Sequence, residues 1–170
     1  MKNSMSRWQL AGFFFTSIAG ILLHFLYEWT NQSIFVAPFS AVNESTWEHM
    51  KLLFFPMFLF ALVQRFFMPN VPDNFWYVKL AGILLGLILI PTTYYTYTGI
   101  SGTSLDWINI GIFFITVAIT YLFETRLFRH NTFACKGPLF ALLILCLIAL
   151  TFIILTFVPP KIPLFEPPLN

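Results

Sequence analysis

The sequence predicts an all-α fold, a polytopic membrane protein built as a bundle of five transmembrane helices, with the amino terminus in and the carboxyl terminus out. Two observations of composition indicate this class, because 58% of the 170 residues are hydrophobic and only 9% are charged. A soluble domain ordinarily has about a quarter of its residues charged. The third observation is that apolar stretches recur at the length that crosses a hydrocarbon core, about 20 helical residues.

The predicted spans follow one another through short connections, so residues 1–158 form one transmembrane domain and residues 159–170 a proline-rich tail. The spans are expected at about residues 8–28, 49–68, 77–98, 105–125 and 138–158. The last span, PLFALLILCLIALTFIILTFV, has no charged residue. The first span ends in LLHFLYEW rather than in a small-residue cleavage site, so we expect a mature helix and not a signal peptide.

The distribution of basic residues predicts the orientation, because Lys and Arg gather in cytoplasmic loops. With the amino terminus inside, the outer segments hold only Lys51 and Lys161. The inner segments then hold seven basic residues, namely Lys2, Arg7, Arg65, Lys79, Arg126, Arg129 and Lys136. Topology therefore explains the basic residues and the net charge of +2. We expect membrane lipids as partners and no nucleic acid.

The polar segment NESTWEHMK, residues 43–51, begins the second predicted span on the outer side. Helix capping explains part of it, since Ser45 and Glu48 match a capping box and acids favour the positive end of the helix dipole. Capping gives no role to Glu44, His49 or Lys51. The segment is therefore a candidate functional site as well as a helix start.

The end of the first predicted span brings more ionisable residues to the same membrane face. His24 and Glu28 are four residues apart, so they lie on one helical face. His24 lies about one turn below the end of its helix, and His49 lies about one turn below the start of the next. In adjacent antiparallel helices these depths match, and we expect the two imidazoles to face each other. Ionisable groups at membrane depth are costly and usually face the bundle interior, a pathway or a partner.

Three interpretations remain open for the set His24, Glu28, Glu44, Glu48 and His49. The first is a divalent metal site, with zinc as a candidate, in which His24, Glu28, His49 and Glu44 are the expected ligands. The second is a proton relay or a cation pathway. The third is a structural network in which Lys51 and the histidines neutralise the acids.

The metal interpretation gives the leading functional hypothesis, a membrane-embedded metal-dependent hydrolase that acts on a lipid or other amphiphile at the outer face. In that scheme Glu48 or Glu44 is the general base on a metal-bound water, and Lys51 stabilises an oxyanion or a phosphate. The alternatives are an ion- or proton-coupled transport or ion-binding protein and a non-catalytic accessory subunit. Helices one, two, three and five supply almost no deeper ionisable residue, which favours a one-sided site over a pore.

Several other features lead to weaker expectations. Asp106 begins the fourth span on the outer side and could complete a site. Gly82 and Gly86 form a G-x-x-x-G pattern that lets the third helix approach a neighbour closely, and its face is a candidate contact between copies of the chain. Glu124, with Arg126, is expected in an interfacial charge group at the inner end of the fourth helix.

The tail and the two cysteines lead to two further expectations. Ile162, Leu164 and Phe165 lie among prolines, which favours a tail that folds back over the outer mouth as a lid against the alternative of a disordered end. We expect these three side chains to be buried against the loops that follow the first and third helices. Cys135 and Cys146 fall at the start and in the middle of the fifth span, so a disulfide is not expected.

The stretches LLHFLYEW, FSAVNESTWEHMKLLFFPM, NFWYVKLAGILLG, YTYTGISG and FVPPKIPLF occur in this order along nearly the whole chain. This combination resembles a family of small bacterial five-helix integral membrane proteins that is classed as a domain of unknown function. NESTWEHMK followed by LLFFP is its most specific part. The ending EPPLN departs from the pattern, which usually continues with Asp-Pro and a glycine-rich end. The resemblance implies a bacterial cytoplasmic (inner) membrane protein and brings no activity with it.

Overall fold

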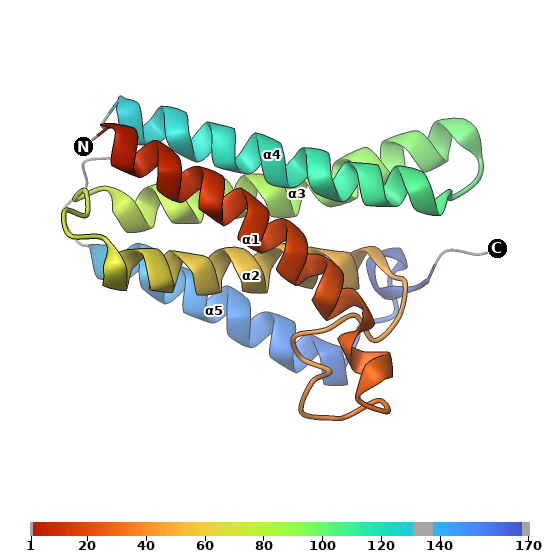
Figure 1. The fold of residues 1–170 in the computed structure, drawn as a ribbon. Helices are drawn as coiled ribbons and strands as arrows, with labels where there is room; N and C mark the ends of the chain where they lie inside the picture. The colour runs from red at the N-terminus through yellow and green to blue at the C-terminus, as the bar shows by residue number, and fades with distance from the viewer. Residues whose placement is uncertain (1, 131–137, 168–170) are drawn as a thin grey trace.

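The computed structural model describes residues 2–130 and 138–167, and these residues form five α-helices and one 3₁₀ turn, with no strand among them (Figure 1). All five helices are long and apolar enough to cross a membrane, which confirms the predicted all-helical class with five candidate spans. Cys135 and Lys136 lie outside the described residues. The elements are α1 (Lys2–Trp29), α2 (Thr46–Phe67), α3 (Phe75–Ser101), α4 (Asp106–Arg129), α5 (Pro138–Phe157) and η1 (Pro163–Phe165).

Helices α2 and α3 form the centre of the bundle. Helix α1 packs on α2 and α4, while α5 packs on α3 and α2 (Figure 1). The central position shows in the burial, because 56% of the most apolar window of α2 and of α3 is buried, against 17% for α5. We call the end where α1 stops and α2 starts the site end, and the other end the opposite end.

The glycine pattern of α3 is used for packing inside one chain. A Cβ atom on Gly82 would lie 2.5 Å from the side chain of Glu124 in α4, and one on Gly86 would lie 2.9 Å from Leu53 in α2. Both glycines are buried. The predicted close helix approach is therefore observed, but α2 and α4 occupy this face, so it is not free to contact a second copy.

Two glycines also determine how α1 crosses α4. A Cβ atom on Gly12 would lie 2.5 Å from the ring of Tyr121, and one on Gly20 would overlap the ring of Phe113. The helices touch along this stretch because neither glycine has a side chain. Beyond Gly20, towards the site end, larger side chains follow, among them His24 on the same helical face. A groove opens there between α1 and α4.

The hydroxyl group of Ser40, in the connection between α1 and α2, forms hydrogen bonds with backbone groups near the end of α1. Ser40 Oγ accepts a hydrogen bond from the Tyr27 N–H at 3.0 Å and donates one to the carbonyl oxygen of Leu23. Leu23 and Tyr27 are one helical turn apart, and a side chain inserted into this ladder is a recognised cause of helix bending. His24 lies inside this turn, so Ser40 fixes the backbone that carries it.

The tail folds back onto the bundle, but against other elements than expected. The Phe165 ring is buried and stacks on Trp47 of α2 at a centroid distance of 4.5 Å, and Trp47 also contacts Phe152 of α5 at 4.5 Å. The expected contact was with the loops after the first and third helices. Ile162 is 47% exposed, so burial of all three apolar tail residues is wrong. Aromatic stacking on Trp47 explains why Phe165 alone is buried.

Candidate metal centre

The segment before α2 is held by side chains that bond to the backbone. Ser45 is the N-cap of α2, and its hydroxyl accepts from the Glu48 N–H at 3.4 Å, as expected for a capping box. The return bond differs, because the Glu48 carboxylate accepts from the Val42 N–H at 2.9 Å rather than from the N–H of Ser45. The Ser45 N–H instead donates to Asn43 Oδ1 at 2.9 Å. These bonds fix the backbone on both sides of Glu44.

Glu48 and Lys51 form a buried ion pair that uses the hydrogen-bonding capacity of the lysine completely. Lys51 Nζ lies 2.6 Å from Glu48 Oε2 and also donates to Ala37 O and Thr156 Oγ1, both at 2.9 Å. An ammonium has three N–H donors, and all three are engaged here. Neither residue belongs to the metal-capable group of the site. This contact joins α2, α5 and the α1–α2 connection, and it realises the structural-network interpretation for these two residues.

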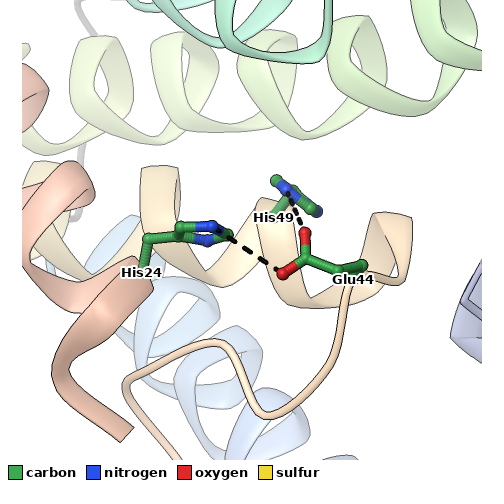
Figure 2. A group of neighbouring side chains, drawn as sticks. All are labelled: His24, Glu44 and His49. Carbon is green, nitrogen blue, oxygen red and sulfur yellow. Dashed lines mark ion pairs between the residues drawn. The ribbon is translucent and has the colours of Figure 1, made fainter. Parts of the chain in front are cut away.

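His24, Glu44 and His49 come together from three parts of the chain (Figure 2). His24 comes from α1, His49 from α2, and Glu44 from the segment before α2, with its carboxylate between the imidazoles. The His24 Nε2 lies 3.7 Å from one carboxylate oxygen and the His49 Nε2 lies 3.6 Å from the other. The ring centroids are 5.6 Å apart. The expected approach of the two imidazoles is therefore observed.

The two nitrogen–oxygen distances in this triad, each to a different oxygen of Glu44, are longer than a direct hydrogen bond. Hydrogen bonds from nitrogen to oxygen have heavy-atom distances of about 2.7–3.2 Å. Two ligand atoms held tetrahedrally at about 2.0–2.1 Å from zinc lie roughly 3.4 Å apart. One ligand atom from each residue lies within 4.8 Å of the others. Since this limit is longer than the separation in a zinc site, the side chains would have to move inward to bind an ion.

The hydrogen bond at the other side of the His49 ring supports this geometry. His49 Nδ1 lies 2.9 Å from the carbonyl oxygen of Ser45, which can only accept a hydrogen bond, so Nδ1 carries the hydrogen and the neutral ring has its lone pair on Nε2, towards Glu44. Metal-ligating histidines are commonly oriented in this way. His24 differs, because its buried Nδ1 has no hydrogen-bond partner among the described residues. The position of His24 depends on the backbone turn of α1 that is hydrogen-bonded to Ser40.

The triad lines a groove of about 660 Å³ between α1 and α4, within the size range of small-molecule sites, about 300–1,000 Å³. Asp106 and Asn109, from the first turns of α4, also line it. Deeper in, the lining is apolar and includes Leu52 and Phe114. Pro167 of the tail lines the groove too. The site therefore joins ligand-type side chains to an apolar wall.

A smaller cavity of about 30 Å³ lies beside the triad, lined by Glu44 and His49 together with polar groups of Thr46, Tyr94 and Asn109. A cavity needs about 10–15 Å³ and two or more polar partners to hold a water molecule. This cavity meets both conditions. It offers a position for water next to the carboxylate and the imidazole of the triad.

The remaining predicted site residues fall in different places. Glu28 is exposed at the end of α1 and is not in the metal-capable group found among the described residues. Asp106, expected only as a possible addition, lines the groove. The tail, expected as a possible lid, reaches the groove through Pro167.

Sequence reasoning missed a second buried ion pair, between Lys79 of α3 and Glu124 of α4. Their charged atoms are 2.6 Å apart, and both side chains are at most 1% exposed. Gln9 Oε1 accepts a further bond from Lys79 at 3.2 Å, and the Tyr121 ring centroid lies 5.3 Å from the ammonium. Glu124 is therefore not grouped with Arg126 at the end of its helix but is buried against Lys79. The sequence feature that could have revealed this pair is Gly82, one turn after Lys79. Because Gly82 has no side chain, it leaves room for the carboxylate of Glu124.

This second pair does not continue the groove. Between the two lies the stretch in which Gly20 packs against the ring of Phe113, so α1 and α4 are in contact there. Further in, the hydroxyl groups of Thr16 and Tyr121 bond to each other at 2.9 Å. The groove with its triad is thus at one end of the bundle.

Comparison with known proteins agrees with the predicted resemblance. No curated protein and no solved structure matches the chain. One family model covers residues 1–170, the full length given. The chain belongs to that family, which is described as a family of unknown function (DUF6512).

Proposed function

We propose that this protein is a membrane-embedded, metal-dependent hydrolase that acts on a lipid or other amphiphile. The observation that carries the proposal is a set of two histidines and one carboxylate that faces a groove with an apolar wall. Catalytic zinc sites have three protein ligands and keep a further position open for water or substrate. His24, Glu44 and His49 are the three proposed ligands, and the role of the divalent ion is to increase the acidity of a bound water.

The order of polar and apolar residues along the groove supports an amphiphile as the substrate. Asp106 lies at the site end of α4 and Phe114 lies eight residues further in, about 12 Å along the helix. Helices α1 and α4, which flank the groove, bury only 22% and 28% of their most apolar windows. The groove is thus bordered by lipid-facing helices. A lipid with its head at the helix ends would bring the bond between head and chain near the triad.

The second carboxylate of the groove is the better candidate for a proton acceptor. The carboxylate of Glu48 already accepts from Lys51 and from the Val42 N–H, and Glu44 is a proposed ligand. Asp106 lines the same groove and is exposed. A general base must reach the proton that it takes directly or through one water. We therefore assign this role to Asp106 in place of Glu48, and we assign Lys51 to the stability of the fold.

We further propose that the amino terminus is cytoplasmic and that the site end faces outward, in a bacterial cytoplasmic membrane. Lys51 and Lys79 are buried and no longer count as loop residues. Among the side chains that the structure describes, the exposed basic residues at the opposite end are Arg7, Arg65, Arg126 and Arg129, against Lys161 at the site end. Four against one favours the same orientation. A reporter fused after Asn170 should be active only if it functions outside the cytoplasm.

The experiment for the hydrolase activity uses the full chain in lipid vesicles of defined phospholipid composition, loaded with Zn²⁺. We expect time-dependent release of a free headgroup or a free fatty acid, detected by mass spectrometry, and its loss in His49→Ala. The matched control is His130→Ala, because His130 is exposed at the opposite end of α4. Binding of zinc without any product in a panel of phospholipids would reject the hydrolase and favour ion binding or an accessory role.

A further inference from the structure

The connection between α1 and α2 presents apolar side chains that are exposed in the described part of the structure. Its residues 33–39, SIFVAPF, are called the apolar loop here. Phe35 is 85% exposed, Ile34 is 64% exposed and Phe39 is 42% exposed. The sequence from Thr30 to Asn43 contains no Asp, Glu, Lys, Arg or His. Exposed patches of this kind mark contact with a membrane or a partner.

We propose that the apolar loop inserts into the lipid leaflet at the site end of the bundle. The apolar loop is continuous with the apolar surface of α1 and α2, which faces lipid if the helices span a membrane. The Phe39 ring contacts the Phe55 ring of α2 at a centroid distance of 5.0 Å, and Phe25 stacks on Trp29 at the end of α1 at 5.8 Å. Trp29 is 63% exposed. The apolar surface therefore runs from the helices into the loop, and a lipid leaflet covers both at once.

The loop also forms hydrogen bonds within its own backbone. The Val36 and Ala37 N–H groups donate to the carbonyl oxygen of Ser33 at 3.0 and 3.1 Å. The Phe39 and Ser40 N–H groups donate to the carbonyl oxygen of Val36 at 3.0 and 3.1 Å. A backbone group without a partner is costly in hydrocarbon, because no water is available there. These four bonds lower the cost of placing the loop at the boundary between headgroups and acyl chains, where its apolar side chains enter the leaflet and water still reaches the remaining backbone groups.

The direction of the chain after α1 also places the loop beside the bundle. Asn31 and Gln32 have φ angles of 52° and 60°, and the Gln32 N–H donates to Tyr27 O at 2.8 Å, five residues back. This left-handed C-terminal motif reverses the chain. In Figure 1 the connection lies beside the bundle near the end of α5, whereas the α3–α4 hairpin projects further along the helix direction. The loop is thus placed laterally, where lipid surrounds a spanning bundle.

The loop is also tied to the bundle at its far end. Lys51 donates to the carbonyl oxygen of Ala37, and Ser40 bonds to the backbone of α1. Glu44 follows only four residues after Ser40 and holds the third position of the triad. Insertion of the loop would therefore anchor the segment that carries Glu44 at a defined depth.

The test is a measurement of membrane depth by a nitroxide spin label on single cysteines, in a chain with Cys135→Ser and Cys146→Ser. The full chain is reconstituted in phospholipid vesicles without added metal. The labelled positions are Phe35→Cys and Ile34→Cys in the loop, with Ile18→Cys as the lipid control and Ser101→Cys as the water control. Ile18 is an exposed residue of α1, and Ser101 is exposed at the end of α3. The readout is the ratio of collisions with oxygen to collisions with a water-soluble nickel complex.

We expect the collision ratio at both loop positions to be several-fold above that of Ser101→Cys and below that of Ile18→Cys, as for side chains at the boundary between headgroups and acyl chains. A ratio at both loop positions equal to that of Ser101→Cys would overturn the proposal and favour a protein partner for the patch. A low ratio at Ile18→Cys would overturn it as well, since the bundle would then not be in the membrane. The measurement needs no metal and no substrate, so its outcome is independent of the proposed hydrolase function.

Discussion

Two groups of ionisable side chains in this bundle differ in how closely their charged atoms approach and in how deeply they are buried. Lys79 and Glu124 meet at 2.6 Å, are at most 1% exposed, and have Gln9 and aromatic rings around them. In the triad of His24, Glu44 and His49 the nitrogen–oxygen distances are 3.6 and 3.7 Å, and the histidines are 23% and 27% exposed beside a groove. We call the first group closed, because its charged atoms are in direct contact and buried, and the second group open, because its atoms are further apart and partly exposed.

The difference shows that the kind of residue does not by itself separate a site from a structural contact. Glu48 and Lys51 lie within the same polar segment as Glu44 and His49, yet they form a closed pair. In the pair of Glu48 and Lys51 all three ammonium donors are engaged, and in the pair of Lys79 and Glu124 burial shuts the charged atoms off from a ligand, although Glu124 Oε1 has no hydrogen-bond partner among the described residues. An open group keeps lone pairs that can still bind an ion or a substrate. We therefore treat the closed pairs as parts of the fold and the open triad as the candidate site.

The largest expected effect comes from opening the closed pair. Glu124→Gln leaves the Lys79 ammonium buried without its carboxylate, which should lower the free energy of unfolding by about 3–5 kcal/mol. Denaturation of the purified protein in detergent measures this loss. The double variant Lys79→Met with Glu124→Leu removes both charges and should recover most of the stability. Equal loss in the single and the double variant would contradict the account of a closed ion pair.

The glycine beside this pair should show the next largest effect. Gly82→Ala places a Cβ atom 2.5 Å from the Glu124 side chain, and overpacking of this kind costs about 1–3 kcal/mol. Gly111→Ala is the matched control, because a Cβ atom there meets nothing within 4 Å. The control should be neutral or slightly stabilising, since alanine is the better helix former. The two variants are compared by the same unfolding assay, and identical stabilities would argue against tight packing at Gly82.

The sequence was sufficient to predict the helices and the meeting of two histidines. Hydrophobic length gives five spans, and the matched depths of His24 and His49 follow from helix geometry in antiparallel neighbours. The pairing of Lys79 with Glu124 was missed because the two residues are 45 positions apart in the sequence. Only the packing of α3 on α4 around Gly82 brings them together. Ser40 was missed for a similar reason, because a lone hydroxyl among apolar residues gives no sign that it will bond to the backbone of another segment.

A smaller effect is expected at the helix start, and it separates capping from ion binding. Ser45→Ala removes the hydroxyl that accepts from the Glu48 N–H, which should cost about 1 kcal/mol of stability. The backbone carbonyl of residue 45, which orients His49, is retained. Zinc content, measured by elemental analysis, should therefore stay at the wild-type level. Loss of metal together with the cap would mean that the two roles of the segment cannot be separated.

The smallest effect on stability is expected at the open triad itself. His24→Ala and His49→Ala each remove a partly exposed side chain, so the free energy of unfolding without metal should change by no more than about 0.5 kcal/mol. The same denaturation assay in the presence of a chelator measures this. A loss as large as that of Glu124→Gln would place the triad among the structural contacts and remove the contrast between the two groups.

Calorimetric titration of the metal-free protein with Zn²⁺ tests the central claim most directly. The account predicts one site per chain in the wild-type protein and in His130→Ala, and at least a tenfold weaker affinity in His24→Ala, Glu44→Ala and His49→Ala, in line with loss of one ligand. Binding should also weaken on acidification, because a protonated imidazole cannot bind the ion. Equal zinc binding by the wild-type protein and the three triad variants, or no binding by any of them, would contradict it.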